Sequence, residues 1–336
     1  MTDMPLILGF ETSCDETGVG VVRGHAVLAN VIASQVEEHA RFGGVVPEVA
    51  ARAHVEAIRS LTHRALRDAG VHSRDLDAIA ATRGPGLAGA LMVGFAYGKA
   101  LAWALERPFL GIDHMEGHLV APRLEDDRFE PPAVVLLASG GHSQIVHVEA
   151  WGQYRTVGST IDDAAGEALD KLARFLGLGY PGGPAIDREA RNGDHAAVAF
   201  PRALADRPFD MSFSGLKTAV ITYVREHHRA GTLPSIADLA ASIQEAVIDV
   251  LVDKTMNAVE ETGAPRVAGG GGVMSNSRLR ERLGEACAER GIDLHLPSPL
   301  LCTDNGAMIA GAAVRRFIEG ERTPWDAGIE PGLRLG

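Results

Sequence analysis

The segment LILGFETSCDETGVGVV, residues 6–22, has two short apolar runs on either side of a polar centre. Leu6–Phe10 and Gly18–Val22 are rich in apolar and β-branched residues, whereas Glu11–Thr17 between them is small and polar. Runs of this length around a short polar stretch are typical of the two strands of a hairpin. The segment therefore predicts a β-hairpin with a polar tip near the start of the chain.

The same plan returns in the second half of the chain, where Val134–Ala138 and Gln144–Val148 flank the polar stretch Ser139–Ser143. Such a repeat of structure, without a literal repeat of sequence, indicates an internally duplicated fold. Each half later continues with a strand, a glycine-rich turn that could bind an anion, and a helix. The strands and turns are Ala78–Thr82 with Gly84–Gly89 in the first half, and Arg266–Ala268 with Gly269–Gly272 in the second.

Amphipathic segments with apolar residues at helical spacing lie between these features and predict an α/β fold with helices covering the sheets. Two facing halves of this kind resemble the actin, sugar-kinase and heat-shock ATPase superfamily, which is two-lobed and duplicated with a cleft between the lobes. An ordinary doubly wound domain with glycines in its tight corners is the alternative. The amphipathic segments are Glu48–Ala69, Asp163–Leu176, Gly215–His228 and Ile236–Glu261.

The charged, proline-bearing segment Pro122–Pro132 is typical of a lobe boundary. We therefore predict an N-terminal ATPase-like lobe over residues 1–121 and a C-terminal ATPase-like lobe over residues 133–300. Residues 301–336 are predicted to form a C-terminal helix and tail that return to the first lobe.

Composition limits the classes of partner. The 336 residues are 46% hydrophobic and carry 32 Lys and Arg against 44 Asp and Glu, a net charge of −12. A stand-alone nucleic-acid binder is usually basic, so any RNA contact of this chain is expected to be local or shared with partner proteins. The best local candidate is the helix Glu48–Ala69, where Arg52, Arg59, His63 and Arg67 share one face, although a plain solvated face explains them equally well.

Targeting features are weak. The three scattered cysteines, Cys14, Cys287 and Cys302, form no Cys-x-x-Cys pair and suit a reducing compartment. The run Leu6–Phe10 is too short for the core of a signal peptide. Ala88–Leu105 is nearly all apolar but contains Lys99, which favours a helix packed in a protein over a membrane span. We expect a cytoplasmic protein with no membrane segment.

The segment His114-Met-Glu-Gly-His118 suits a helix, on which two histidines four residues apart face one ion. At about 100° per residue, Glu116 points about 200° away from His114. Glu116 therefore cannot act as the general base of a zinc protease, and the metalloprotease interpretation is disfavoured. Asp304 is a candidate third ligand, but an aspartate at a helix start more often caps the helix.

Six motifs follow one another along the chain: Glu11-Thr-Ser-Cys-Asp-Glu16, Gly43-Gly-Val-Val-Pro-Glu48, His114-Met-Glu-Gly-His118, Ser139-Gly-Gly-His142, Ser212-Phe-Ser-Gly-Leu-Lys217 and Cys302-Thr-Asp-Asn-Gly306. Together, from about residue 6 to 312, they resemble the TsaD family, the tRNA N6-adenosine threonylcarbamoyltransferases, which were earlier described as sialoglycoprotein endopeptidases. Each motif alone is weakly specific, but a chance match to all six in this order is negligible. That family has the two-lobed ATPase-like fold.

The resemblance implies that His114, His118 and Asp304 hold one divalent metal ion, iron(II) in preference to zinc, with open positions for the substrate. It implies threonylcarbamoyl-adenylate as that substrate. Glu11 or Asp15 is a candidate for handling the proton of the attacking amine, although both could belong to a solvated acidic tip. The residues that the resemblance places around the adenylate are Leu137, Ala138, Ser139, Gly140, Gly141, Asp170, Gly183, Asp187 and Asn276.

The implied reaction moves the threonylcarbamoyl group to N6 of the adenosine next to the anticodon, in tRNAs that read codons beginning with A, and releases AMP. The implied partners are a paralogous protein of the same fold, a small ATPase and the enzyme that makes the adenylate. Where the ATPase superfamily has Asp-x-Gly in its phosphate hairpin, this chain has Glu11-Thr-Ser13, so phosphoryl transfer is not implied. A non-enzymatic nucleotide-dependent scaffold is a further alternative.

Overall fold

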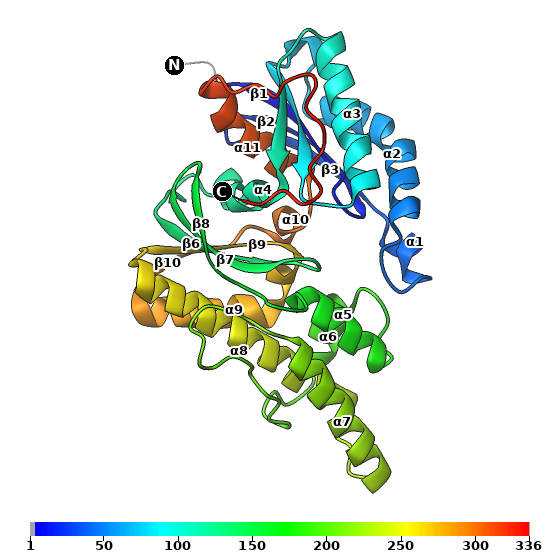
Figure 1. Cartoon of the computed structure of the whole chain (residues 1–336), viewed down its shortest axis with the longest axis vertical. Coiled ribbons are helices and arrows are strands. Elements are labelled where there is room, and N and C mark those ends of the chain that lie inside the picture. Colours follow the sequence, from blue (N-terminus) through cyan, green and yellow to red (C-terminus); the bar gives the residue numbers. More distant parts are fainter. Residues whose placement is uncertain (1–3, 336) are drawn as a thin grey trace. The chain divides into compact units, whose positions relative to one another are not determined.

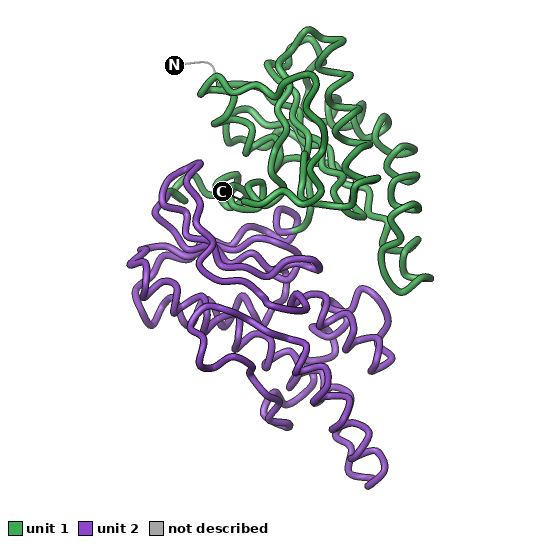
Figure 2. The backbone as a smooth tube through the Cα atoms, in the orientation of Figure 1, with its two compact units in different colours: residues 1–130, 303–336 green, residues 131–302 purple. Residues whose placement is uncertain are grey.

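The chain contains two compact units (Figure 2). A computed structural model describes residues 4–335. The first unit contains the described residues up to Glu130 together with those from Thr303 onward, and the second runs from Pro131 to Cys302. The first unit is therefore discontinuous in sequence, and the C-terminal segment belongs to it.

Unit 1 is built on a five-stranded sheet in the order β3-β2-β1-β4-β5 (Figure 1). β1 lies in the centre, antiparallel to β2 and parallel to β4, and all six of its residues are buried. Burial on both faces explains its apolar sequence. The strands are β1 Leu6–Glu11, β2 Glu16–Arg23, β3 Ala26–Ser34, β4 Ala78–Gly84 and β5 Phe109–Asp113, and the helices are α1 Val36–Ala40, α2 Pro47–Asp68, α3 Ala88–Ala104, α4 His114–Val120 and α11 Gly306–Ile318, with short 3-10 turns η1 Ser73–Asp75 and η2 Ala121–Leu124.

Unit 2 has a second five-stranded sheet in the order β10-β9-β6-β7-β8. Its central strand β6 is again antiparallel to the next strand and parallel to the strand that follows a long helical insertion. This matching order confirms the predicted duplicated α/β fold. The strands are β6 Ala133–Ala138, β7 Ser143–Ala150, β8 Gln153–Ser159, β9 Arg266–Gly270 and β10 Asp293–His295, and the helices are α5 Ala165–Phe175, α6 Gly182–Ala190, α7 Ser214–Ala230, α8 Ile236–Thr262, α9 Ser277–Arg290 and α10 Pro299–Cys302, with a 3-10 turn η3 Gly272–Ser275.

The hairpin tip in unit 1 is shorter than the sequence predicts. Glu11 is the last residue of β1, where it pairs with Gly18 of β2, and its side chain is fully buried. The sequence pattern assigned it to the polar tip because a glutamate is rarely placed inside a sheet. Hydrogen-bond partners that come from elsewhere in unit 1 explain the difference, and they are described with the site below.

Glycines bring the backbone of α11 directly against the hairpin. A Cβ atom added at Gly20 of β2 would lie 2.2 Å from the backbone nitrogen of Ala307, and one added at Gly9 would lie 2.4 Å from the carbonyl oxygen of Gly306. No side chain fits between these backbones. This contact fixes where α11 begins, and with it the position of the residues just before that helix.

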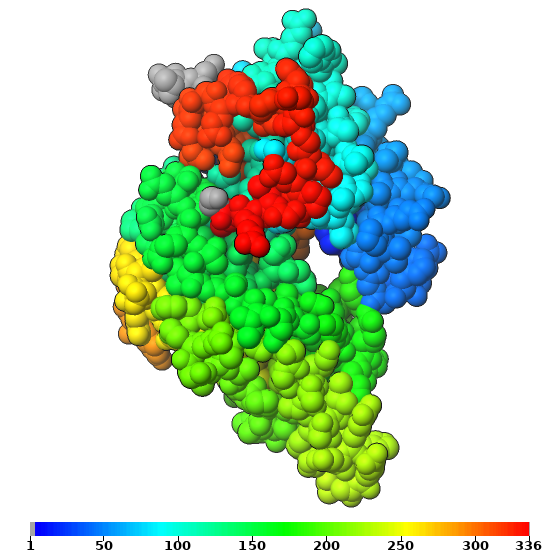
Figure 3. All heavy atoms as spheres, viewed as in Figure 1, coloured from blue at the N-terminus to red at the C-terminus, as the bar shows by residue number. Residues whose placement is uncertain are grey.

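The C-terminal segment of unit 1 lies along α3, where Figure 3 shows the red residues beside the cyan ones. The Lys99 ammonium of α3 donates to the carbonyl oxygens of Trp325 and Ala327, which accounts for the single cation in that apolar helix. Thr323 donates its N–H to Phe109 of β5. No helix among residues 4–335 combines the length and the apolar character needed to cross a membrane.

We predict that Gly20→Ala destabilises the chain by about 1–3 kcal/mol, since the added methyl meets backbone that cannot rotate away. The matched control is Gly284→Ala in α9, where an added Cβ meets nothing within 4 Å. Removing a helical glycine there should stabilise the fold by about 0.5–1 kcal/mol. Urea unfolding followed by circular dichroism measures both changes. A Gly20→Ala variant as stable as the original chain would contradict the backbone contact.

Candidate functional site

The two histidines lie on a short helix whose start is set by Asp113. The Asp113 carboxylate accepts hydrogen bonds from the backbone N–H groups of Met115 at 2.7 Å and Glu116 at 3.3 Å, so it caps α4 directly after β5. An aspartate cap satisfies N–H groups that the first helical turn leaves open. His114 and His118 then lie one turn apart on one face, with ring centroids 4.8 Å from each other.

Asp304 joins them from the other end of the chain. Asn305, not Asp304, caps α11, because its side-chain oxygen accepts from the N–H of Met308 at 2.9 Å. An Asp304 carboxylate oxygen lies 3.1 Å from Nε2 of His118 and 3.5 Å from Nε2 of His114. One ligand atom from each residue lies within 4.8 Å of the other two. The structure thus brings the predicted triad together and assigns the cap to its neighbour.

Glu11 contacts Nδ1 of His114, the ring nitrogen that does not face Asp304. Its carboxylate is fully buried, lies 2.9 Å from Nδ1 of His114 and accepts a hydrogen bond from the Thr82 hydroxyl at 2.6 Å. The N–H of Ser13 donates to the other oxygen. A carboxylate that accepts the Nδ1 proton of a histidine fixes the ring and turns the Nε2 lone pair outward, which is the usual support of a metal-bound histidine.

The charges around His114 favour a cation. Burial opposes the imidazolium, but the Asp304 and Glu11 carboxylates outweigh it and raise the pKa of His114 to about 10. When Nδ1 carries the only proton, the Nε2 lone pair faces the Asp304 oxygen, and two acceptors repel unless a proton or a metal ion lies between them. Two imidazole nitrogens from buried histidines and one carboxylate oxygen from the half-buried Asp304 therefore fit a divalent metal ion of the iron or zinc type.

The two histidines are not supported equally. Among the described residues, Nδ1 of His118 is buried and has no hydrogen-bond partner, whereas Nδ1 of His114 contacts Glu11.

The second predicted carboxylate, Asp15, lies in the hairpin tip with 9% of its surface exposed. Its neighbour Glu16 is half-buried, and desolvation together with the charges of Asp15 and Asp304 raises the pKa of Glu16 to about 9. The tip thus concentrates acidic groups near the triad.

Glu116 faces away from the histidines, as the helical geometry predicts. It is 1% exposed, and one of its oxygens accepts from Arg316 of α11 at 2.9 Å and 2.6 Å. Arg315 donates to the other oxygen at 3.3 Å. A carboxylate held by two guanidinium groups on the far side of α4 cannot serve as a base at the triad. Its ion pairs instead join α4, which bears the histidines, to α11, which follows Asp304.

In unit 2 the predicted adenylate residues start at the tip of the β6–β7 hairpin. Leu137 and Ala138 are buried strand residues, so only their backbone atoms are available to a ligand. The Ser139 side-chain oxygen accepts from the N–H of His142 at 3.1 Å and so shapes the turn. An added Cβ at Gly140 or Gly141 would meet nothing within 4 Å. The tip therefore presents open backbone without bulky side chains.

The polar residues predicted to contact the adenylate each connect two elements. Asp170 of α5 accepts from the N–H groups of Gly182 at 2.6 Å and Gly183 at 3.3 Å, at the start of α6. Asp187 of α6 accepts from the Ser277 hydroxyl at 2.7 Å, at the start of α9. Asp170 therefore connects α5 to the start of α6, where Gly183 lies, and Asp187 connects α6 to the start of α9. These contacts form one chain of contacts from α5 to α9.

Asn276 lies at the end of that chain of contacts. Its side-chain oxygen caps α9 by accepting from Leu279, and its amide donates to Gln244 of α8 at 2.8 Å. The hairpin tip is adjacent to the turn before it, since an added Cβ at Gly271 would lie 2.4 Å from the carbonyl oxygen of Ala138. The predicted adenylate residues therefore form two neighbouring groups in unit 2. Gln244 and Ser277 were not predicted, because neither carries a sequence signal beyond being polar.

The sequence comparisons agree with this geometry. The family model TsaD, described as tRNA N6-adenosine threonylcarbamoyltransferase, matches residues 26–311. This chain belongs to the TsaD family. A Clostridium perfringens protein named tRNA N6-adenosine threonylcarbamoyltransferase is 48% identical over 336 residues, covering 99% of each chain. One of the same name from Desulfitobacterium hafniense is 49% identical over 331 residues, covering 98% of this chain and 97% of the relative.

Solved structures support the fold alone. A full-length HypF in its phosphate- and nucleotide-bound form has a TM-score of 0.62 at 15% identity, covering 96% of this chain and 57% of that one. Component A of the Acidaminococcus fermentans (R)-2-hydroxyglutaryl-CoA dehydratase has a TM-score of 0.56 at 16% identity, covering 94% and 98%. These similarities extend over nearly all of this chain at low sequence identity and support its overall fold.

We predict that His114→Ala or His118→Ala removes bound iron or zinc with little loss of folding, because each variant deletes one of three ligands and leaves the core intact. Elemental analysis of the purified chain measures the metal, and the melting temperature of the metal-free chain measures the fold. If both variants keep one metal ion per chain, the histidine pair is structural.

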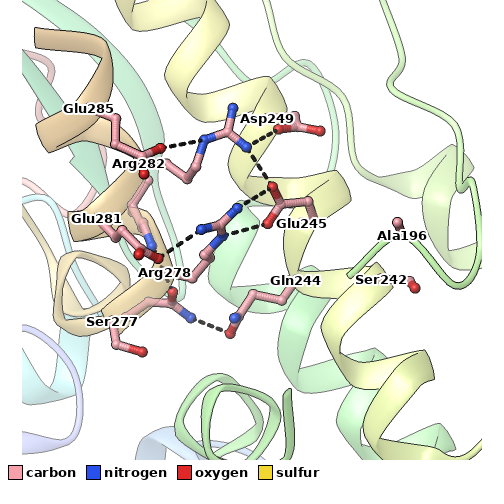
Figure 4. Close-up of polar contacts among 12 residues, drawn as sticks. Ala196, Ser242, Gln244, Glu245, Asp249, Ser277, Arg278, Glu281, Arg282 and Glu285 are labelled. Atoms are coloured by element: carbon pink, nitrogen blue, oxygen red, sulfur yellow. Dashed lines mark hydrogen bonds and ion pairs between the residues drawn. The ribbon is translucent and has the colours of Figure 1, made fainter. Parts of the chain in front are cut away.

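We also predict that Glu116→Gln weakens metal binding by roughly 10-fold, since the neutral amide loses the ion pairs that hold α4 on α11. The matched control is Glu245→Gln in unit 2. Glu245 of α8 is also buried and paired with two arginines, Arg278 and Arg282 of α9 (Figure 4). Competition with a chelator of known affinity measures the dissociation constant. Glu245→Gln should lower the melting temperature without changing metal affinity; equal metal affinities in both variants would rule out the role of Glu116.

Proposed function

We propose that this chain transfers the threonylcarbamoyl group of threonylcarbamoyl-adenylate to N6 of the adenosine next to the anticodon, in tRNAs that read codons beginning with A, and releases AMP. The observation that carries the proposal is the assembly of His114, His118 and Asp304 in a chain that matches named transferases over 99% of its length. Of the motifs that carry the sequence resemblance, His114-Met-Glu-Gly-His118 and Cys302-Thr-Asp-Asn-Gly306 contain these three residues. The motif that begins at Glu11 supplies the carboxylate that contacts His114.

The metal centre supplies a Lewis acid with open positions for the oxygens of the substrate when iron(II), which we favour, or zinc is bound. His114, His118 and Asp304 are its protein ligands. Glu11 keeps the Nδ1 proton on His114, so that Nε2 would be the nitrogen that binds the metal. Glu116 of the histidine helix does not suit the role of a metalloprotease base, because it is ion-paired on the opposite face of α4.

The adenylate is proposed to bind to unit 2. The open turn at Gly140 and Gly141 suits a phosphate, since backbone N–H groups without side chains allow close approach. Asp170 and Asp187 suit the ribose hydroxyls, because a carboxylate that already accepts from the chain has further lone pairs. Gly183 leaves room beside Asp170, where an added Cβ would meet nothing within 4 Å. Asn276 is proposed to hold the glycine turn in place beside the hairpin tip.

Proton transfer from the attacking amine is proposed to fall to Asp15. Of the two carboxylates that the resemblance suggests, Glu11 has no exposed surface and already bonds to His114 and Thr82. Asp15 lies in the tip and keeps 9% exposure. Burial favours the neutral acid of Glu11, but the charge and hydrogen bond of His114 outweigh it and lower the pKa of Glu11. We therefore assign Glu11 to positioning His114.

The proposed setting is the cytoplasm, with a paralogous protein of the same fold, a small ATPase and the adenylate-forming enzyme as partners. Support comes from the net charge of −12, which makes efficient binding of a polyanion by this chain alone unfavourable. The predicted cleft between the two halves stays a prediction.

A reconstituted reaction tests the function. The chain is mixed with tRNA, threonylcarbamoyl-adenylate and the three partners, and the digested tRNA is analysed for N6-threonylcarbamoyladenosine by mass spectrometry. We expect the modified nucleoside only with the intact chain. Metal-dependent cleavage of peptides without nucleoside formation would favour a protease, and nucleotide binding without either product would favour a scaffold.

We predict that Asp170→Ala and Asn276→Ala each weaken adenylate binding by roughly 1–3 kcal/mol, the usual effect of losing a buried hydrogen-bond partner. Calorimetry with a non-hydrolysable analogue measures the affinity. Ser235→Ala is the matched control for Asn276, because Ser235 also caps a helix, α8, by accepting from Asp238 at 3.0 Å. Both caps should lose about 1 kcal/mol of stability. Unchanged analogue affinity in Asp170→Ala and Asn276→Ala would remove unit 2 as the adenylate site.

A further inference from the structure

Helix α7 leaves the packed part of unit 2 after its first turns. Of its 17 residues, only Leu216 and Val220 are buried. Tyr223 and Val224 pack partly against the core, and no side chain after them is fully buried. Figure 1 shows the C-terminal half of α7 extending past α5 and α6. Most helices gain their stability from tertiary packing of an apolar face. Packing within unit 2 therefore does not explain the exposed C-terminal half of α7.

The start of this helix is firmly anchored. Asp162, in the loop between β8 and α5, accepts from the hydroxyls of Ser212 at 2.5 Å and Ser214 at 2.7 Å, and from the N–H of Phe213 at 2.8 Å. These bonds use the first residues of the motif Ser212-Phe-Ser-Gly-Leu-Lys217, which the proposed chemistry does not otherwise employ. Four donors on one carboxylate, counting the N–H of Ser214, fix the direction in which α7 leaves the unit.

The solvent face of α7 carries polar groups in one line. Thr218, Thr222, Arg225 and Arg229 are all exposed, and their spacing of four, three and four residues places them on the side opposite Leu216 and Val220. At 1.5 Å per residue this line is about 16 Å long. Two guanidinium groups and two hydroxyls are donors that suit phosphate oxygens.

The cations of α7 are not neutralised within the chain. Among the described residues, none of Lys217, Arg225 and Arg229 has a carboxylate within 4.0 Å, and Glu226 is the sole acidic residue of the helix. In the rest of unit 2 the ion-paired arginines include Arg155, Arg191, Arg202, Arg207, Arg278 and Arg282. The helix is thus a positive arm on a protein of net charge −12.

The face that the sequence favoured for RNA, on α2, is less suited. Arg52 pairs with Glu48, and Arg67 lies 3.9 Å from Asp68. Exposed pairs of this kind add little stability, but they cancel the field that attracts a phosphate. Arg59 is the arginine of that predicted set with no such partner among the described residues.

We propose that the exposed face of α7, formed by Thr218, Thr222, Arg225 and Arg229 with Lys217 at its edge, binds the phosphate backbone of the substrate tRNA. The proposal rests on the proposed function, which supplies the polyanion. Contacts to phosphates position a nucleic acid without reading its sequence, which suits an enzyme that accepts several tRNAs. The arm thereby supplies locally the positive charge that the whole chain lacks.

The test compares two double charge reversals in the full chain. Arg225→Glu with Arg229→Glu changes the arm, and Arg155→Glu with Arg207→Glu makes the same change in net charge at ion-paired, exposed arginines of the same unit. Fluorescence anisotropy with a labelled tRNA transcript over a series of KCl concentrations gives the dissociation constant and its salt slope. Melting temperature and binding of the adenylate analogue report on folding and on the adenylate site.

We expect the α7 reversal to weaken tRNA binding about 10-fold or more and to reduce the salt slope by about 2, roughly 0.9 for each lost phosphate contact. Arg225→Lys with Arg229→Lys should keep most of the slope, since a lysine still contacts a phosphate as a point charge. Analogue affinity should not change. Equal losses in the two reversals would assign the effect to net charge and overturn the proposal.

Unchanged tRNA affinity in the α7 reversal also overturns the proposal. If the α7 reversal keeps its tRNA affinity but loses turnover in the reconstituted reaction, the arm would instead be assigned to binding an acidic protein partner. Failure of the proposed function is a separate result. A wild-type chain that forms no modified nucleoside in the reconstituted reaction removes the transferase, whereas wild-type tRNA binding that is lost in the α7 reversal still supports the arm.

Discussion

The backbone contact between α11 and the β1–β2 hairpin is the constraint on which the candidate metal centre depends. Gly9, Gly20 and Gly306 leave no room for a side chain, so the helix lies as close to the sheet as its own backbone allows. Asp304 precedes that helix by two residues and is therefore carried to the carboxyl end of β1, where Glu11 ends the strand. Glu116 adds a second tie, from α11 to the helix of the histidines.

The two units share one topology but differ in the residues at the ends of their central strands. In unit 1 the polar residues Glu11 and Thr82 lie near the carboxyl ends of the central parallel strands β1 and β4, and Glu11 supports an imidazole. In unit 2 the corresponding strands end in Ala138 and Gly270, and open backbone replaces the side chains. The two units keep the same strand order, whereas the residues at the ends of their central strands differ.

Much of this could be predicted from local pattern. The central strands, the long helices and the duplicated order follow from periodicity, and α2, α3 and α7 begin and end within two residues of the predicted segments. The i, i+4 spacing of His114 and His118 fixed their common face and the opposite direction of Glu116. These are short-range properties, since helix geometry alone determines them.

Contacts between distant parts of the chain could not be predicted from pattern. Nothing in the sequence around Glu11 signals that His114 and Thr82 lie beside it, so a buried strand residue resembled a residue of the tip. The choice between Asp304 as ligand and as helix cap likewise needed the position of Asn305, which makes the cap bond. Motif resemblance supplied Asp304, whereas the residue types alone favoured the cap.

The discontinuity of unit 1 has a consequence for the order of events on the ribosome. Unit 2 is one continuous segment and can fold as soon as Cys302 has left the exit tunnel, but the first sheet waits for a helix that is synthesised after it. Until then the β1–β2 hairpin exposes the glycine-lined surface that α11 will cover. Asp304 is synthesised just before that helix, so the candidate metal centre has only its two histidines until the chain has grown past residue 304.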